Sequence, residues 1–357
     1  MVKISKATRR FERWLGKRTP LIKSSIQLKH RMMSEDPFTF LRATFYRWAQ
    51  TWPEVCPELA RAPSLLAVGD LHVENFGTWR DAEGRLVWGV NDFDETHLIP
   101  YTNDLVRLAV SANLAIRSKH LKLSMDHACK SILDGYTATL KVGGRPFVLE
   151  EQHDWLRTAA TGELRNPPQF WAKMDMLPRT REIPKSARRA LNSMLPQLEQ
   201  YEVAQRVAGV GSLGCERFVA VANWQGGKIA REAKALAPSA WIWANDPKGS
   251  EKILYEVALE TACRALDPCV RLRGRWLVRR LAPDCSRIEL TELSRKTDEK
   301  RLLEAMGSET ANIHLGSRAA IKTVRRDLAG RRKRDWLHAA TKSMTDSVVE
   351  DYEGWTG

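Results

Sequence analysis

The sequence has no long apolar run. A membrane-spanning helix requires about eighteen consecutive apolar residues, and the sequence contains no such run. The N-terminal stretch MVKISKATRRFERWLGKRTP is basic, yet it lacks the continuous apolar segment of a signal peptide. These absences predict that the protein neither spans a membrane nor is secreted, and they favour a cytoplasmic location.

Cysteine is scarce and scattered. The six cysteines form no C-x-x-C pair and have no zinc-like spacing with the eight histidines. They are Cys56, Cys129, Cys215, Cys263, Cys269 and Cys285. Most lie in apolar surroundings, which is typical of reduced core residues in a cytoplasmic protein.

Acidic residues are too few to balance the basic ones, and the formal net charge is +14. This excess favours anionic partners, which include nucleotides, phosphorylated metabolites, nucleic acid and anionic surfaces. The most basic stretch, RRDLAGRRKRDW at residues 325–336, contains one Trp and no recognisable nucleic-acid module. A solvated helix face is therefore favoured there, and nucleic acid is disfavoured as a partner.

The 357 residues suffice for two or three domain-sized units, and they mix helical and strand patterns. In the first half, an apolar strand at residues 64–70 is followed by a hairpin at 78–92, whose turn is Asp81–Gly84. Helical patterns cover residues 38–52 and begin again at Asn103. The fold class predicted from this mixture is α+β.

The pattern changes at residue 207. Two strand-like runs follow, joined by a turn at residues 225–227. After them come a helical segment at 250–266, a strand at 274–282 and a basic helical region at 297–350. The sequence contains no internal repeat.

Two polar motifs stand at predicted strand ends: VGDLHVENFG at residues 68–77 and NDFDE at 91–95. Asp70 and Asp92 each follow a strand, and Asn75 returns to the same edge across a short loop. Asp and Asn most often cap turns, and either motif alone would be interpreted that way. Together they favour a phosphoryl-transfer site, in which oxygen ligands hold magnesium.

A two-metal phosphoesterase is the competing interpretation, because Gly-Asp-x-His also begins metal sites in that class. His72, Asp92 and His97 would then contribute ligands. Such enzymes also need later Asn-His and Gly-His-x-His elements, and the remaining histidines form neither. The sequence therefore disfavours this class.

GDLHVENFG, NDFDE and PYTNDLVRLA resemble the aminoglycoside-phosphotransferase branch of the protein-kinase-like superfamily. The resemblance implies that Asp70 is the catalytic Asp, that Asn75 and Asp92 are magnesium ligands, and that Asp104 braces the catalytic loop. Val68 departs from the pattern, because those enzymes have His at this position. Over nearly its whole length the chain is also similar to a bacterial family, domain of unknown function 2252, which has no assigned substrate.

A glycine pattern of the G-x-G-x-x-G type, GVGSLG, occurs late in the chain. Its cofactor-binding candidates are Gly209, Gly211, Ser212 and Gly214. A dinucleotide-binding turn requires a helix after the third glycine, whereas CERFVAVANW reads as a strand. In kinases, a glycine loop connects two strands and covers the triphosphate. A hairpin with glycines for its own geometry remains the alternative.

In a kinase the following strand carries a Lys that contacts the phosphates. The bacterial family 2252 has a Lys-Glu-Ala element in this strand. Alignment with that element puts Arg231 at the position of the lysine, with Lys228 and Lys234 as flanking alternatives. Arg is a departure, since Arg and Lys are not interchangeable at a phosphate site. The next helix offers Glu256 or Glu260 as the ion-pair partner, and the sequence does not choose between them.

The glycine loop follows the catalytic loop in this chain, which reverses the kinase order. Placing residues 205–318 before residues 62–115 restores it, and this predicts a bilobal, circularly permuted kinase-like fold. Permutation needs chain ends that lie close together at the surface. The predicted divisions are a basic helical segment at 1–61, the catalytic and metal part of the large lobe at 62–204, the glycine-loop lobe at 205–296, and basic helices completing the large lobe at 297–357.

These features predict an ATP- and magnesium-dependent phosphotransferase that acts on a hydroxyl of a small molecule or protein. Transfer of AMP from the same pocket is a further enzymatic option. Arg231 and Val68 favour a different class, a pseudokinase or basic scaffold that transfers nothing. The sequence names no acceptor.

Overall fold

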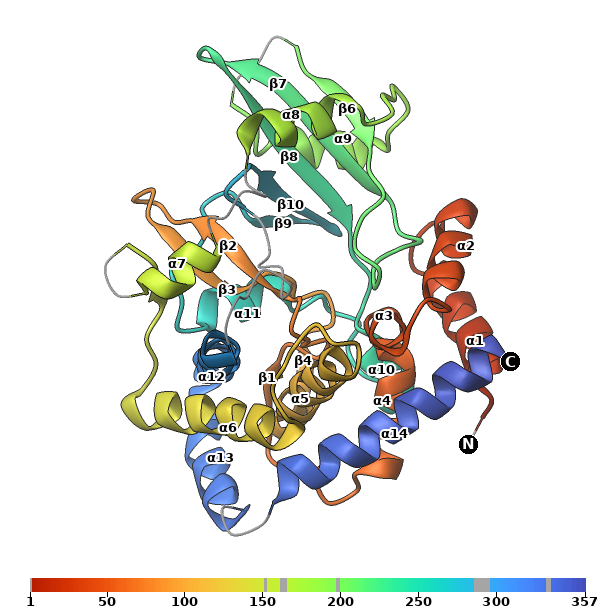
Figure 1. Cartoon of the computed structure of the whole chain (residues 1–357). Coiled ribbons are helices and arrows are strands. Elements are labelled where there is room, and N and C mark those ends of the chain that lie inside the picture. The colour runs from red at the N-terminus through yellow and green to blue at the C-terminus, as the bar shows by residue number, and fades with distance from the viewer. Residues whose placement is uncertain (1, 151–152, 161–165, 197–199, 286–295, 332–334) are drawn as a thin grey trace.

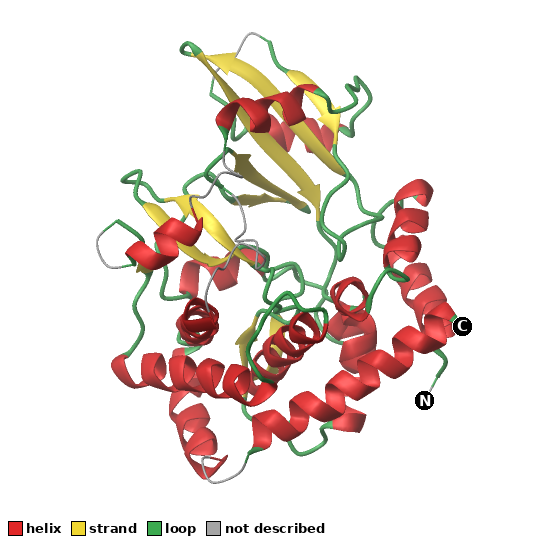
Figure 2. Ribbon diagram, in the orientation of Figure 1, coloured by secondary structure: helices red, strands yellow, loops and turns green. Residues whose placement is uncertain are grey.

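The computed structural model describes residues 2–150, 153–160, 166–196, 200–285, 296–331 and 335–357. The fold is α+β, as the sequence predicts (Figure 2). A strand-rich part at one end adjoins a larger part in which helices surround two small sheets (Figure 1). No described helix combines the length and apolar character of a membrane span, and all six cysteines are free.

The strand-rich part is one antiparallel sheet with the order β6-β7-β8-β10-β9. Its strands are β6 (Glu202–Gln205), β7 (Arg217–Trp224), β8 (Gly227–Ala235), β9 (Arg271–Arg273) and β10 (Trp276–Leu281). β7 and β8 form the predicted hairpin. Gln225 and Gly226 have φ values of 47° and 82°, and two positive φ values are what a tight hairpin turn of this kind requires.

Side-chain alternation gives this sheet two different faces. On one face, Phe218 and Ala233 pack against α9 (Lys185–Asn192). On the other, Val219 and Ala230 pack against α8 (Pro167–Asp175). The predicted division between residues 204 and 205 falls inside β6, and it separates α8 and α9 from most of the sheet that they cover.

The helical part is built around α5 (Tyr101–Arg117), which is buried over nearly its whole length. Around it lie α6 (Met125–Val142), α12 (Lys296–His314) and α14 (Trp336–Thr356). The remaining helices are α1 (Ile4–Gly16), α2 (Lys23–Met32), α3 (Pro37–Ala43), α4 (Phe45–Val55), α7 (Asp154–Ala160), α10 (Ala240–Asn245), α11 (Tyr255–Thr261) and α13 (Arg318–Arg331).

Helices α6 and α12 cross at reciprocal glycines. A Cβ atom on Gly135 would lie 1.9 Å from the Glu304 carbonyl oxygen, and one on Gly307 would lie 2.1 Å from the Ile132 carbonyl oxygen. Only glycine permits this approach of the two backbones. The crossing fixes α12, whose C-terminal end contributes to the site described below.

Two small sheets connect the helices to the polar motifs. One pairs β1 (Ser64–Ala67) with β4 (His97–Pro100), and the other has the order β2-β3-β5. Its strands are β2 (Phe76–Arg80), β3 (Leu86–Val90) and β5 (Phe147–Val148). β2 and β3 form the predicted hairpin, in which Gly84 has a φ of 75°. The hairpin returns the chain from the first motif to the second.

Two helices differ from the sequence prediction. The pattern at 38–52 forms two helices, because the chain leaves helical geometry at Thr44, whose φ is −126°. α3 begins after the capping residue Asp36, whose carboxylate accepts hydrogen bonds from the Phe38 and Thr39 amides. The segment 250–266 is helical only at α11.

Candidate functional site

The first polar motif forms a tight loop after β1. Gly69 has a φ of 81°, and a Cβ atom there would lie 2.5 Å from the Glu95 carbonyl oxygen. The next residue is Asp70, whose Oδ1 accepts hydrogen bonds from Arg107 Nε at 2.9 Å and Nη2 at 2.5 Å. Burial raises the pKa of Asp70, and Arg107 offsets part of that rise. Arg107, fully buried on α5, therefore fixes the orientation of this carboxylate.

Asp104 stabilises the loop that carries Asp70. Its carboxylate accepts hydrogen bonds from the backbone amides of Val68 at 2.8 Å and Gly69 at 3.0 Å. His314 Nε2 lies 3.1 Å from the same carboxylate, and Tyr136 Oη lies 2.9 Å from His314 Nδ1. A histidine from the end of α12 thus contacts the bracing carboxylate, although Val68 occupies the position where the resemblance expects one.

Asn75 ties the two motifs together. Its Nδ2 donates to the carbonyl oxygens of Asp70 at 3.2 Å and Asp92 at 3.0 Å. Its Oδ1 accepts from the Asp92 amide at 3.0 Å. The structure thus brings these three predicted residues together. The amide oxygen predicted as a metal ligand already accepts one hydrogen bond, which leaves it one lone pair.

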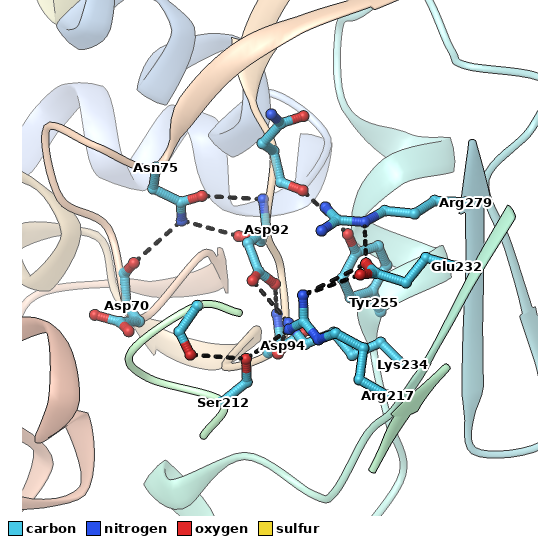
Figure 3. Close-up of polar contacts among 12 residues, drawn as sticks. Asp70, Asn75, Asp92, Asp94, Ser212, Arg217, Glu232, Lys234, Tyr255 and Arg279 are labelled. Atoms are coloured by element: carbon cyan, nitrogen blue, oxygen red, sulfur yellow. Dashed lines mark hydrogen bonds and ion pairs between the residues drawn. The ribbon is translucent and has the colours of Figure 1, made fainter. Parts of the chain in front are cut away.

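Asp92 and Asp94 share a single lysine (Figure 3). Lys234 Nζ lies 2.8 Å from Asp92 Oδ2 and also contacts Asp94 Oδ2. Burial opposes ionisation of Asp92, but Lys234 more than compensates and holds its pKa well below the usual range. Burial and the neighbouring Asp92 raise the pKa of Asp94. One lysine does not balance two carboxylates, so the pair favours a further proton or a cation.

The glycine loop lies directly against the first motif. A Cβ atom on Gly211 would be 3.5 Å from Asp70 Oδ2 and 3.1 Å from the Arg42 carbonyl oxygen. The loop is held from outside by Lys29, whose Nζ donates to the Gly211 carbonyl oxygen at 3.0 Å. Gly209 and Gly214 have positive φ values of 76° and 103°, which accounts for glycine at both positions. Two regions more than a hundred residues apart thus meet at one place.

Three arginines surround one carboxylate above the loop. Glu232 is fully buried on β8, and it contacts Arg206, Arg217 and Arg279. Burial opposes ionisation of Glu232, but the arginines hold its pKa far below the usual range. Arg217 Nη2 also donates to Ser212 Oγ at 2.7 Å, so the predicted loop serine is tied to this cluster (Figure 3).

The predicted phosphate contact, Arg231, is not brought to the cluster. Strand alternation turns it to the α9 face, where its Nε donates to the Met194 carbonyl oxygen at 3.2 Å. Lys228 lies near the β7–β8 turn and pairs with Asp175. Lys234, the other alternative, is the one that reaches Asp92. The physical reason is that side chains alternate along a strand. Glu232 and Lys234 lie on the face of β8 where they contact Arg279 and Asp92, so Arg231 lies on the opposite face.

Neither predicted glutamate pairs with these cations. Glu256 Oε1 accepts a long hydrogen bond of 3.4 Å from the Leu272 amide. Glu256 and Glu260 both line the cleft, at its α11 wall. The carboxylate that pairs with the arginines is instead Glu232, on the same strand as Lys234.

A cleft of about 660 Å³ lies between the polar motifs and the glycine loop, a size typical of small-ligand sites. Asp70, Asn75, Asp92 and Asp94 form its floor, and the glycine loop with Arg206, Arg217 and Arg279 forms its roof. Among the described residues, no three His, Cys, Asp or Glu side chains group as a metal site. However, Asp94 Oδ1 is buried without a hydrogen-bond partner in the described chain, and such an oxygen fits a hard cation.

Residues 21–166 match the model of a family described as an uncharacterized protein conserved in bacteria, DUF2252. Residues 21–166 are therefore similar to this family and are called the DUF2252 segment. No curated protein and no solved structure matches the chain. The predicted similarity to domain of unknown function 2252 is confirmed for these residues, whereas the kinase-like resemblance stays a prediction.

The DUF2252 segment supplies the floor of the cleft and leaves its roof to later residues. It contains Asp70, Asn75, Asp92 and Asp104 and ends before the glycine loop. Sequence reasoning missed Arg107, although it stands three residues after Asp104 and hence on nearly the same helix face. It also missed His314, for which no local signal exists.

The surroundings of Glu95 lead us to expect that the free energy of unfolding depends on pH. Its carboxylate accepts hydrogen bonds from Ser239 Oγ and the Ala240 amide, yet burial raises its pKa to about 7. Because the folded pKa exceeds the unfolded one, this group stabilises the fold fully below pH 4.5, and the stabilisation is lost as the pH rises through 7. One pKa unit corresponds to about 1.4 kcal/mol, and partial exposure reduces the expected total to about 1–2 kcal/mol.

The measurement is the free energy of unfolding in urea at several pH values between 5 and 8. Glu95→Gln should lose less stability over this range than the parent does, because the amide mimics the protonated acid. Glu182→Gln, at an exposed position, is the matched control and should follow the parent. Identical slopes for Glu95→Gln and the parent would contradict the assignment.

Proposed function

We propose that the protein is an ATP- and magnesium-dependent phosphotransferase with a bilobal, circularly permuted kinase-like fold. The observation that carries the proposal is the approach of Gly211 to Asp70 in the cleft that is also lined by Asp92, the ion-pair partner of Lys234. A glycine loop between the first two strands and a lysine on the third are the parts that a kinase uses around its phosphates. β6, β7 and β8 supply them in that order.

The permuted order has its own support. The Leu66 amide of β1 donates to Ser317 Oγ at 2.9 Å, just beyond the end of α12. The helix that would precede the catalytic loop in the usual order thus ends beside the strand that leads into it. The two chain ends lie together at α1 and α14 (Figure 1), where a Cβ atom on Gly354 would be 3.7 Å from Ile4. The predicted position of the ends, at the α12–β1 junction, differs, because α13, α14 and α1 to α4 intervene.

Each floor residue then has a chemical task. Asp70 keeps Oδ2 toward the cleft and orients the acceptor hydroxyl, while Arg107 holds Oδ1. Asp92 and Asp94 would hold the magnesium ion, and Asn75 fixes the distance between the motifs. Magnesium bound there would neutralise charge on the phosphates during transfer. Asp104 and His314 keep the loop in place and contact no substrate.

The first experiment is the shift of the unfolding temperature with saturating ATP, with and without magnesium. A ligand that binds only the folded state stabilises it by about 2.7 kcal/mol at a hundredfold excess over Kd. We expect a shift that depends on magnesium and is abolished by a chelator. The absence of any shift with ATP, GTP, CTP or UTP would contradict the proposed function. Release of ADP or of pyrophosphate in a turnover assay then distinguishes phosphoryl transfer from AMP transfer.

A non-catalytic nucleotide-binding protein is the second candidate, and one contact favours it. Gly211 lies against Asp70 Oδ2, in the space that an acceptor hydroxyl needs. A magnesium-dependent thermal shift combined with background turnover, for a panel of sugar, aminoglycoside and protein acceptors, would favour this candidate.

A further inference from the structure

The roof of the cleft carries more positive charge than its own residues neutralise. Arg206, Arg217 and Arg279 converge on Glu232 from three different strand regions, and all three line the cleft. One carboxylate offsets one guanidinium, so this arginine roof retains two positive charges. Burial lowers the pKa of Arg206, and Glu232 offsets part of that fall.

The floor has the opposite balance. In the described part of the chain, the ion pairs of Asp92 and Asp94 are both with Lys234, so one negative charge remains when both carboxylates are ionised. Asp70 is balanced by Arg107. A cleft with an acidic floor and a basic roof complements a ligand that carries a cation on one side and anionic oxygens on the other. A metal-bound polyphosphate chain has this charge distribution.

The roof is also preorganised. Glu232 has no exposed surface, and it fixes one edge of each guanidinium. A guanidinium has five N–H donors, and within the described chain the only other hydrogen-bond acceptor for these three guanidinium groups is Ser212. The remaining donors of Arg206 and Arg279, whose side chains are about a quarter exposed, are available to a ligand in the cleft.

Lys234 is placed differently. Its side chain is 2% exposed and lies between the two floor carboxylates, so it is not free to contact a phosphate chain. Its position keeps Asp92 ionised. The kinase-like resemblance assigns contact with the phosphates to one lysine. Because Lys234 is held between the carboxylates, other cationic side chains must make that contact.

We propose that the arginine roof, Arg206, Arg217 and Arg279 positioned by Glu232, is the binding site for the polyphosphate chain of the nucleotide. Lys234 then serves the carboxylates of the floor. This inference rests on the proposed function for the identity of the nucleotide, but the roof recognises the phosphate chain itself. Inorganic tripolyphosphate is therefore expected to bind and to compete with ATP.

The test uses the full chain and isothermal titration with two probes, inorganic tripolyphosphate and magnesium-ATP. Arg206→Gln and Arg279→Gln should each weaken binding of both probes at least tenfold. Arg231→Gln is the matched control, because it removes the same charge one residue from Glu232 but on the opposite face of the sheet. It should change neither Kd more than twofold.

Several outcomes distinguish this inference from the proposed function. If tripolyphosphate binds in an Arg206-dependent manner and ATP does not, the roof is supported and the nucleotide function fails. If both probes bind the parent and both roof variants equally, the roof is wrong and the nucleotide function stands. An equal loss of affinity in Arg231→Gln would mean that binding depends only on net charge, and it would overturn the proposal.

A measurement on the parent alone covers the case in which a variant does not fold. Binding of tripolyphosphate to several guanidinium groups should weaken at least tenfold between low and high ionic strength, because salt screens these partly exposed charges. A Kd that is independent of salt would overturn the proposal.

Discussion

Asp70→Asn is expected to abolish most turnover while nucleotide binding persists. Asp70 Oδ2 faces the glycine loop and the cleft, whereas Oδ1 is held by Arg107. The amide keeps an oxygen for the buried Arg107 but loses the negative charge that orients the acceptor hydroxyl. We expect kcat to fall by roughly 10²–10⁴-fold, the range attributed to a positioned acid–base group. The Kd of magnesium-ATP should change less than threefold, because Asp70 does not contact the nucleotide.

The measurement is steady-state turnover together with titration of magnesium-ATP. Asp92→Ala is the contrasting variant, since it removes a metal-holding carboxylate and should lose both turnover and magnesium-dependent binding. Asp175→Asn, the same change outside the cleft beside Lys228, is the control and should behave as the parent. Unchanged kcat in Asp70→Asn would remove Asp70 from the catalytic machinery.

Gly307→Ala is expected to have a large effect on stability. The added Cβ atom would meet the Ile132 backbone carbonyl oxygen at 2.1 Å, and a backbone atom of a packed helix cannot move aside as a flexible side chain does. Overpacking usually costs about 1–3 kcal/mol. Because the clash here separates two long helices, we expect about 3 kcal/mol or more of lost unfolding free energy.

Unfolding in urea, followed by circular dichroism, measures this loss. Gly330→Ala is the control: it also lies in a helix, but an added Cβ atom meets nothing within 4 Å. Alanine there should stabilise the protein by about 0.5–1 kcal/mol, the intrinsic preference over glycine. A similar midpoint for both variants would mean that the α6–α12 crossing is looser than described.

The sequence predicted the elements around the floor well. The strand predicted at 64–70 is β1 (Ser64–Ala67), and the hairpin predicted at 78–92 is formed by β2 and β3 at 76–90, with its turn at Gly84 as predicted. Local patterns of this kind are sufficient because each motif begins where its own strand stops. The meeting of the glycine loop with Asp70 was a hypothesis from motif order, and the contact at Gly211 agrees with it.

The roof could not be predicted in the same way. Alignment with a family element selected Arg231, whereas alternation along β8 puts Glu232 and Lys234 together on the cleft face. The alternation along this strand is visible in the sequence, but the prediction followed the Lys-Glu-Ala alignment instead. The convergence of Arg206, Arg217 and Arg279 depends on strand pairing across more than seventy residues, for which no local pattern exists.

The tie between Asp104 and His314 has a consequence for how the chain can be divided. His314, on α12, contacts a carboxylate that fixes the amides of Val68 and Gly69. The DUF2252 segment ends at residue 166 and therefore contains the loop without the helix that steadies it. Expressed alone, this fragment would not be an autonomous unit, and the cleft belongs to no single stretch of the sequence.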